Sequence, residues 1–123
     1  MNNQPQVKLT FTATIHGGLE PHRVTVSGRA AWFLLSLMQA GKRGVTTLER
    51  PAPRIGHYLF QLRRAGFNVT TDYETHGGVF GGNHGRFKLV DDVTVEGGTL
   101  GAYLDSTEGR REFPNAVFAR AAA

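Results

Sequence analysis

The chain has 123 residues, of which 40% are hydrophobic and 20% are charged, so length and composition favour one globular domain with a modest core. No apolar run approaches the roughly 18 residues of a membrane span, no basic start followed by an apolar stretch indicates a signal peptide, and the absence of cysteine excludes disulfides and thiolate metal sites. We therefore expect a cytoplasmic protein without a membrane partner.

The positive charge is concentrated in one segment. The formal net charge is +4, from 14 Lys and Arg against 10 Asp and Glu. Residues 42–64 hold six of the cations and a single acid, Glu49, so the net charge of +5 in this segment exceeds that of the whole chain. A positive field of this kind favours a polyanionic partner such as nucleic acid.

The N-terminal part of the chain predicts a β-hairpin. Residues 7–15 alternate apolar and polar side chains, which is typical of a half-buried strand. Gly17 and Gly18 interrupt this pattern, and residues 23–26 resume it. We therefore expect a hairpin with a long loop over residues 7–27.

A helix is expected next, over residues 29–40. Ser27 is a candidate N-cap and Gly41 a candidate stop signal. The spacing places several apolar side chains on one face: Ala30, Leu34, Leu37 and Met38. Trp32 falls on the opposite side, where it is either packed under the N-terminal hairpin or exposed to a partner.

The middle of the chain predicts a helix-turn-helix. Residues 45–49 favour a short helix or a single turn, which Pro51 and Pro53 end. Because proline suits the first turn of a helix, we expect a second helix over residues 53–65, closed by Gly66.

Two alternating runs then predict a second hairpin. Residues 67–73 and 86–90 bracket a Gly-rich tip, and we expect them to pair as antiparallel strands. Phe80 in this tip is expected to fold back on the domain or to touch a partner. Weaker patterns follow: a strand over 93–95, a helical turn over 100–104, and a frayed or helical end over 116–123.

This order of elements predicts the α+β fold class, as a winged helix with an additional N-terminal β-hairpin. We divide the chain into an N-terminal extension (1–23), a winged-helix domain (24–93) and a partly flexible C-terminal extension (94–123). The apolar faces of the two helices and the strand that follows them predict the core residues: Leu34, Leu37, Ile55, Leu59, Leu62 and Phe67.

The helix expected over 53–65 has a polar face without acids. Arg, Gln and His side chains on this face are the types that bind base edges, and Arg also binds phosphate. An ordinary solvated face usually mixes Lys with Glu, whereas no acid occurs from residue 51 to residue 71. We therefore interpret the face as a recognition surface for DNA.

The second expected hairpin, which forms the wing of the predicted fold, is the second candidate contact. Its glycines allow the backbone to approach phosphate closely. Hairpin geometry alone also accounts for these glycines. The candidate DNA-binding residues come from the turn, the second helix and the wing: Lys42, Arg43, Thr46, Thr47, Arg50, Arg54, His57, Tyr58, Gln61, Arg64, Asn83, His84 and Arg86.

No catalytic residue, metal or cofactor is predicted, and we expect a protein that is not an enzyme. No Walker lysine follows the glycines. Asp91 and Asp92 are adjacent in an extended run, so their side chains point to opposite faces. His76 and His84 are candidate metal ligands, but the loop between them has no carboxylate.

Several short motifs carry a family resemblance. These are residues 26–32 (VSGRAAW), 40–46 (AGKRGVT), 50–54 (RPAPR) and 74–78 (ETHGG), together with Tyr58, Leu62, Arg63, Gly66 and His84. Over residues 24–90 the chain resembles small winged-helix proteins of alphaproteobacteria and their phages. The resemblance implies the fold, and it implies DNA binding by analogy.

Two functions compete at this point. The first is binding of double-stranded DNA, as a transcriptional regulator from a phage, a prophage or a related mobile element. The second is a protein–protein interaction module on the same scaffold, in a homodimer or with another protein, with Trp32, Phe80 and the wing as the interface. An open, positive face around Arg54 and Arg64 favours the first, and a covered face favours the second.

Overall fold

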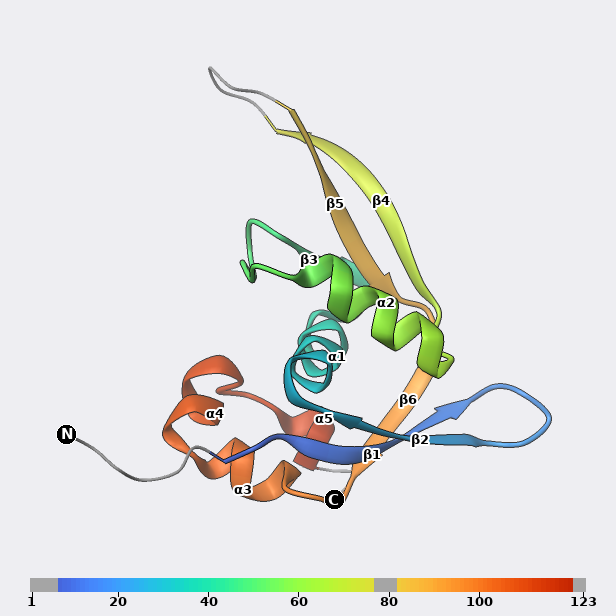
Figure 1. Cartoon of the computed structure of the whole chain (residues 1–123), viewed down its shortest axis with the longest axis vertical. Coiled ribbons are helices and arrows are strands. Elements are labelled where there is room, and N and C mark those ends of the chain that lie inside the picture. The colour runs from blue at the N-terminus through green and yellow to red at the C-terminus, as the bar shows by residue number, and fades with distance from the viewer. Residues whose placement is uncertain (1–6, 77–81, 121–123) are drawn as a thin grey trace.

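The computed structural model describes residues 7–76 and 82–120. Two small antiparallel sheets lie on either side of a central helix (Figure 1). The elements follow in the order β1 (Thr10–His16), β2 (His22–Ser27), α1 (Gly28–Ala40), a 3-10 turn η1 (Gly41–Arg43), β3 (Val45–Thr46), α2 (Ile55–Ala65), β4 (Val69–His76), β5 (Gly82–Leu89), β6 (Asp92–Glu96), α3 (Leu100–Asp105), α4 (Thr107–Glu112) and α5 (Val117–Arg120).

The first sheet has the order β2-β1-β6 and confirms the predicted N-terminal hairpin. β1 pairs antiparallel with β2, and Phe11 lies opposite Val26. The expected strand over residues 93–95 is β6, which pairs with the other edge of β1 and places Val95 opposite Ala13. The C-terminal part of the chain therefore joins the sheet that the N-terminus begins.

Helix α1 is buried over most of its surface, beyond the apolar face that the spacing predicted. Every residue from Ala30 to Leu37 is buried, because α1 contacts both sheets as well as α2 and α5. Phe33 meets Phe87 of β5 edge to face, with ring centroids 6.0 Å apart. Trp32 is only 5% exposed, which excludes it from an open partner surface.

The ends of α1 match the prediction only in part. Gly41 has φ +58° and its N–H donates to the Leu37 carbonyl, so it ends the helix as expected. Ser27 occupies the N-cap position but does not cap the helix with its side chain. Its hydroxyl instead shares a 2.8 Å hydrogen bond with the Thr10 hydroxyl across the β1–β2 pair.

The segment between α1 and α2 contains a strand and a turn. β3 pairs with β5, and Val45 lies opposite Phe87. A reciprocal contact then holds one turn, since the Glu49 N–H donates to the Thr46 hydroxyl and the Glu49 carboxylate accepts from the Thr46 N–H. Of the two predicted alternatives, the structure has the single turn. Pro53 precedes α2, which begins at Ile55 instead of residue 53.

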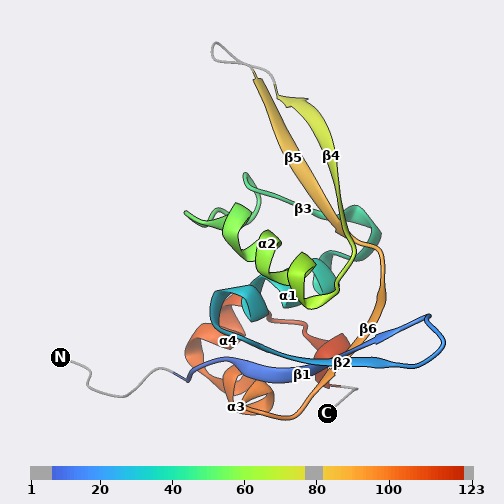
Figure 2. The same ribbon diagram turned by 45° about the vertical axis from the view of Figure 1, so that its right-hand side comes forward.

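The second sheet contains the wing, which we define as the hairpin of β4 and β5. These strands pair antiparallel, from Val69 opposite Leu89 to Asp72 opposite Arg86 and beyond, as predicted. The wing projects from the rest of the molecule, at the end opposite α3 and α4 (Figures 1 and 2). The predicted contacts of Phe80 and of the Gly-rich tip lie outside the described residues.

One hydrophobic cluster runs from Leu9 to Ala119. The six predicted core residues are all buried, which confirms that part of the prediction. The cluster also takes in α3 and the segments that follow it, through Leu100, Leu104 and Phe113. In the described ranges no helix is long and apolar enough to cross a membrane.

Candidate nucleic-acid interface

The exposed face of α2 is the centre of the candidate site. Ile55, Leu59 and Leu62 are buried against the core and fix the orientation of the helix. The opposite face carries four exposed polar side chains at or near the helix: Arg54, His57, Gln61 and Arg64. Tyr58 is half-buried at the boundary, as expected. These four side chains are open to solvent, and α2 itself lies beside the base of the wing (Figure 1).

Phe60 also lies on this face, and the sequence analysis missed it. Its side chain is 58% exposed. It stands one helical turn before Arg64 and three residues after His57, which are the spacings of neighbours on a helix surface. The same helical spacing that assigned the polar residues would have placed Phe60 among them.

The free positive charge of α2 comes from its two ends. Arg54 and Arg64 form no ion pair with any residue that the structure describes. Arg63, beside Arg64, is used differently, because its guanidinium donates to the Val69 carbonyl at 2.7 Å and to the Thr71 hydroxyl at 3.1 Å. Arg63 therefore ties α2 to the first strand of the wing.

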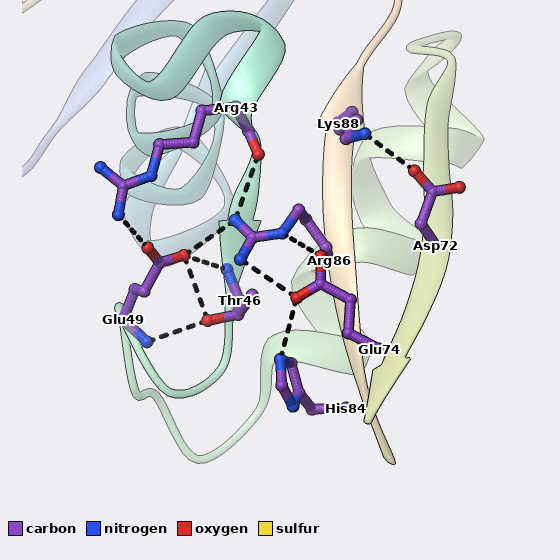
Figure 3. A network of polar contacts seen from close by, with 8 residues as sticks. All are labelled: Arg43, Thr46, Glu49, Asp72, Glu74, His84, Arg86 and Lys88. Carbon is purple, nitrogen blue, oxygen red and sulfur yellow. Dashed lines mark hydrogen bonds and ion pairs between the residues drawn. The ribbon is translucent and has the colours of Figure 1, made fainter. Parts of the chain in front are cut away.

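Arg86 is the centre of a polar network at the base of the wing (Figure 3). Its Nε donates to Glu74 at 2.5 Å, and its Nη1 donates to Glu49 at 3.2 Å and to the Arg43 carbonyl at 3.1 Å. His84 lies 3.2 Å from Glu74 on the same side. The hydrogen bond from Arg86, its charge and the contact with His84 together lower the pKa of Glu74 despite partial burial. Glu74 in turn raises the pKa of Arg86.

Glu49 completes this network from the turn after β3. Burial raises its pKa, but hydrogen bonds from the Thr46 N–H and hydroxyl and from Arg43 outweigh burial and lower the pKa overall. The Arg43 guanidinium lies 2.5 Å from the Glu49 carboxylate and remains 76% exposed. The charges of Arg43 and Arg86 are thus matched by two carboxylates, those of Glu49 and Glu74.

Two other candidate residues are held by contacts within the fold, Thr46 as a buried side chain and Arg50 as a partly buried one. Thr46 is 1% exposed and holds the turn with Glu49. Arg50 donates to the Glu112 carboxylate at 2.9 Å and to the Glu112 carbonyl at 3.0 Å. Its guanidinium also lies over the rings of Trp32 and Phe113, 5.3 Å and 4.8 Å from their centroids. Neither side chain belongs to the exposed face of α2.

The remaining candidates are divided between the turn and the wing. Lys42 and Thr47 are exposed. His84 is half-buried and contacts Glu74. Asn83 pairs with Thr75 through the backbone, and its side chain lies outside what the structure describes. In the described part of the chain, no group of three His, Cys, Asp or Glu side chains is placed to hold a metal ion.

Comparison with known families supports the geometry. A family model described as a winged helix domain matches residues 23–99, which is more than half of the chain. This match, together with the hairpin β1–β2 before the first helix, confirms the fold class predicted from the sequence. Comparisons with curated proteins and with solved structures find no match.

Proposed function

Because the chain belongs to the winged-helix domain family, we propose that it binds double-stranded DNA through the exposed face of α2. The observation that carries this proposal is the state of that face. It is open, it holds Arg54 and Arg64 without a carboxylate partner among the described residues, and no acid occurs from residue 51 to residue 71. Helix-turn-helix proteins place the corresponding helix in the major groove.

The dimensions support this docking mode. A helix with its side chains is about 10–12 Å across, and the major groove is about 12 Å wide. Two contacts hold α2 rigidly for such a role: its buried face packs on α1, and Arg63 ties it to the Val69 carbonyl of the wing. A rigidly held recognition helix loses little conformational entropy when it binds.

The side chains of the face divide into two roles. Arg54 and Gln61 are placed to contact base edges, where Arg binds guanine and Gln binds adenine through paired hydrogen bonds. Arg64 and His57 flank them, and Lys42 in the turn is suited to phosphate. Arg43 and Arg86 can contribute to phosphate binding only in competition with Glu49 and Glu74, so we assign them a smaller share.

We further propose a regulatory role, as a transcription factor of phage, prophage or related mobile-element origin in the cytoplasm, where its DNA is found. The support is the resemblance of residues 24–90 to small winged-helix proteins of that origin. Binding of this kind needs no catalytic residue and no cofactor.

A protein-interaction module is the second candidate, and a specific observation favours it. Leu48, Phe60 and Tyr73 are exposed by 62%, 58% and 78%. Large exposed apolar side chains at a wing and a recognition helix are compatible with a protein partner. The charge of the α2 face makes DNA the stronger candidate.

Fluorescence-polarisation titration of a labelled random duplex tests the proposal. The double variant Arg54→Ala/Arg64→Ala should bind at least about tenfold more weakly at low salt, because it removes two charges that contact DNA. The matched control is Arg110→Ala/Arg111→Ala, which removes the same charge from exposed positions on α4, far from the wing. Equal losses in both double variants would indicate attraction by net charge alone, and no loss in the α2 variant would refute the assigned surface.

A further inference from the structure

Phe60 is an exposed aromatic ring in the middle of α2. It is the sixth of the eleven residues of the helix, and more than half of its side-chain surface is open to solvent. It is not a member of the hydrophobic cluster, and no described aromatic ring or guanidinium is stacked on it. Most of the ring therefore faces solvent, whereas its neighbour Leu59 is buried in the core.

The ring has hydrogen-bond donors beside it on the helix surface. Arg64 follows it by one helical turn and His57 precedes it by three residues, and both side chains are exposed. The face of α2 therefore presents one apolar group, halfway along the helix, beside polar groups.

This pattern matches one feature of the DNA major groove. The base edges there present donors and acceptors, and the only apolar group among them is the C5-methyl of thymine. A side chain that contacts this methyl must be apolar and must project from the helix face that enters the groove. Phe60 meets both conditions, and its polar neighbours meet the requirements of the flanking edges and phosphates.

We propose that Phe60 determines specificity by packing on a thymine methyl, so that the DNA site contains thymine opposite the middle of α2. This inference rests on the proposed function and adds a preferred base to it. In this inference the exposed ring contacts a base directly, whereas Arg54 and Arg64 contribute both to affinity and to the recognition of bases.

A second copy of the chain is a poorer occupant for this face. A two-fold symmetric contact across α2 would bring Arg54 and Arg64 of one copy against the same residues of the other. No acid from residue 51 to residue 71 is present to compensate them. Like charges placed together at an interface oppose association, whereas the phosphates of DNA attract them.

The test begins with selection of a preferred duplex from a randomised library by the full-length protein. Each thymine of that site is then replaced singly by deoxyuridine, which removes only the methyl group. Wild-type protein should lose about fourfold in affinity at one or two positions, the value expected for one buried methyl. Phe60→Ala should bind the thymine site more weakly and should show no further loss with deoxyuridine. Leu19→Ala, which removes a fully exposed apolar side chain from the loop between β1 and β2, serves as the control and should behave as wild type.

Several outcomes overturn the inference. The first is that the selection yields no preferred sequence. The second is that no replacement of thymine by deoxyuridine changes the affinity of the wild-type protein. The third is that such a replacement weakens binding equally in wild type and in Phe60→Ala. In each of these cases binding to random duplex still supports the proposed function. If wild-type protein binds no duplex at low salt, both proposals fail. The wild-type series with deoxyuridine needs no variant protein, so the folding of Phe60→Ala does not limit the test.

Discussion

Arg50 should stabilise the fold without contributing to DNA binding, although its position in the basic segment first suggested a DNA contact. Its guanidinium lies over the rings of Trp32 and Phe113 and donates twice to Glu112. These contacts connect the turn before α2 to the end of α4, which are 62 residues apart in the chain. Substitution of Arg50 by Met retains an apolar stem of similar length and removes the charge.

The magnitude follows from the contacts that Met cannot make. A hydrogen bond to a charged group contributes about 1.5–3 kcal/mol, and each cation–π contact at a partly exposed site contributes about 0.5–1 kcal/mol. The side chains of Arg50 and Glu112 are 21% and 24% exposed, so solvent screens the pair only in part. Because Met recovers some of the packing on both rings, we expect Arg50→Met to lower the free energy of unfolding by about 2–3 kcal/mol.

Urea denaturation followed by Trp32 fluorescence measures this loss, and the duplex titration measures binding by the same variant. Arg54→Met is the matched control. Arg54 follows Arg50 by four residues, and its side chain is exposed and has no ion pair with a described residue. The control should change the unfolding free energy by no more than about 0.5 kcal/mol and should weaken DNA binding.

The reverse result would refute this reasoning. One such result is that Arg50→Met loses less than about 1 kcal/mol of stability and weakens duplex binding as much as Arg54→Met does. Arg50 would then break its ion pair with Glu112 in order to bind phosphate. The structural role would then be wrong and the original assignment of Arg50 to the DNA surface would stand.

Three further predictions concern the scaffold. Leu59→Ala should cost about 2–5 kcal/mol by urea denaturation, because the side chain is 7% exposed, and a loss below about 1 kcal/mol would contradict the orientation of α2. Gly44→Ala should cost more than about 2 kcal/mol in the same assay, because Gly44 has φ +74° and a Cβ there would lie 2.6 Å from the Phe87 carbonyl oxygen; an unchanged midpoint would refute it. The free energy of unfolding should fall as pH drops below the ordinary Glu pKa of 4.5, since the lowered pKa values of Glu49 and Glu74 make the unfolded chain bind protons first. Glu74→Gln should flatten that dependence, and an unchanged pH profile would show that the network contributes nothing.

Local patterns were sufficient to predict the hairpins and the two faces of α2. Alternation with period two and glycine breaks placed β1–β2 and β4–β5, because each pair is adjacent in the chain. Helical spacing separated Leu59 and Leu62 from Arg64 correctly. Each of these features depends on residues close in sequence, which is where spacing carries information.

Long-range contacts account for the parts that spacing could not predict. The burial of both sides of α1 depends on β5 and α5, which return to it from later in the chain. The partners of Arg86 lie 12 and 37 residues away, so no local pattern indicated that Glu74 and Glu49 compensate its charge.

Helix α4 is a different case, since a local signal was present. The Ser106 hydroxyl accepts from the Gly109 N–H, as in an N-cap, before a polar segment that lacks an apolar stripe.

The most direct test of the central claim is the affinity of wild-type protein for random duplex at about 50 mM and about 200 mM salt. Three cations of the proposed surface, Lys42, Arg54 and Arg64, have no ion pair with a described residue. If each neutralises one phosphate, the logarithm of the association constant should fall with the logarithm of salt concentration with a slope of about −2.7. No detectable binding at about 100 µM protein in low salt, or an affinity independent of salt, would contradict the assignment of this face to DNA.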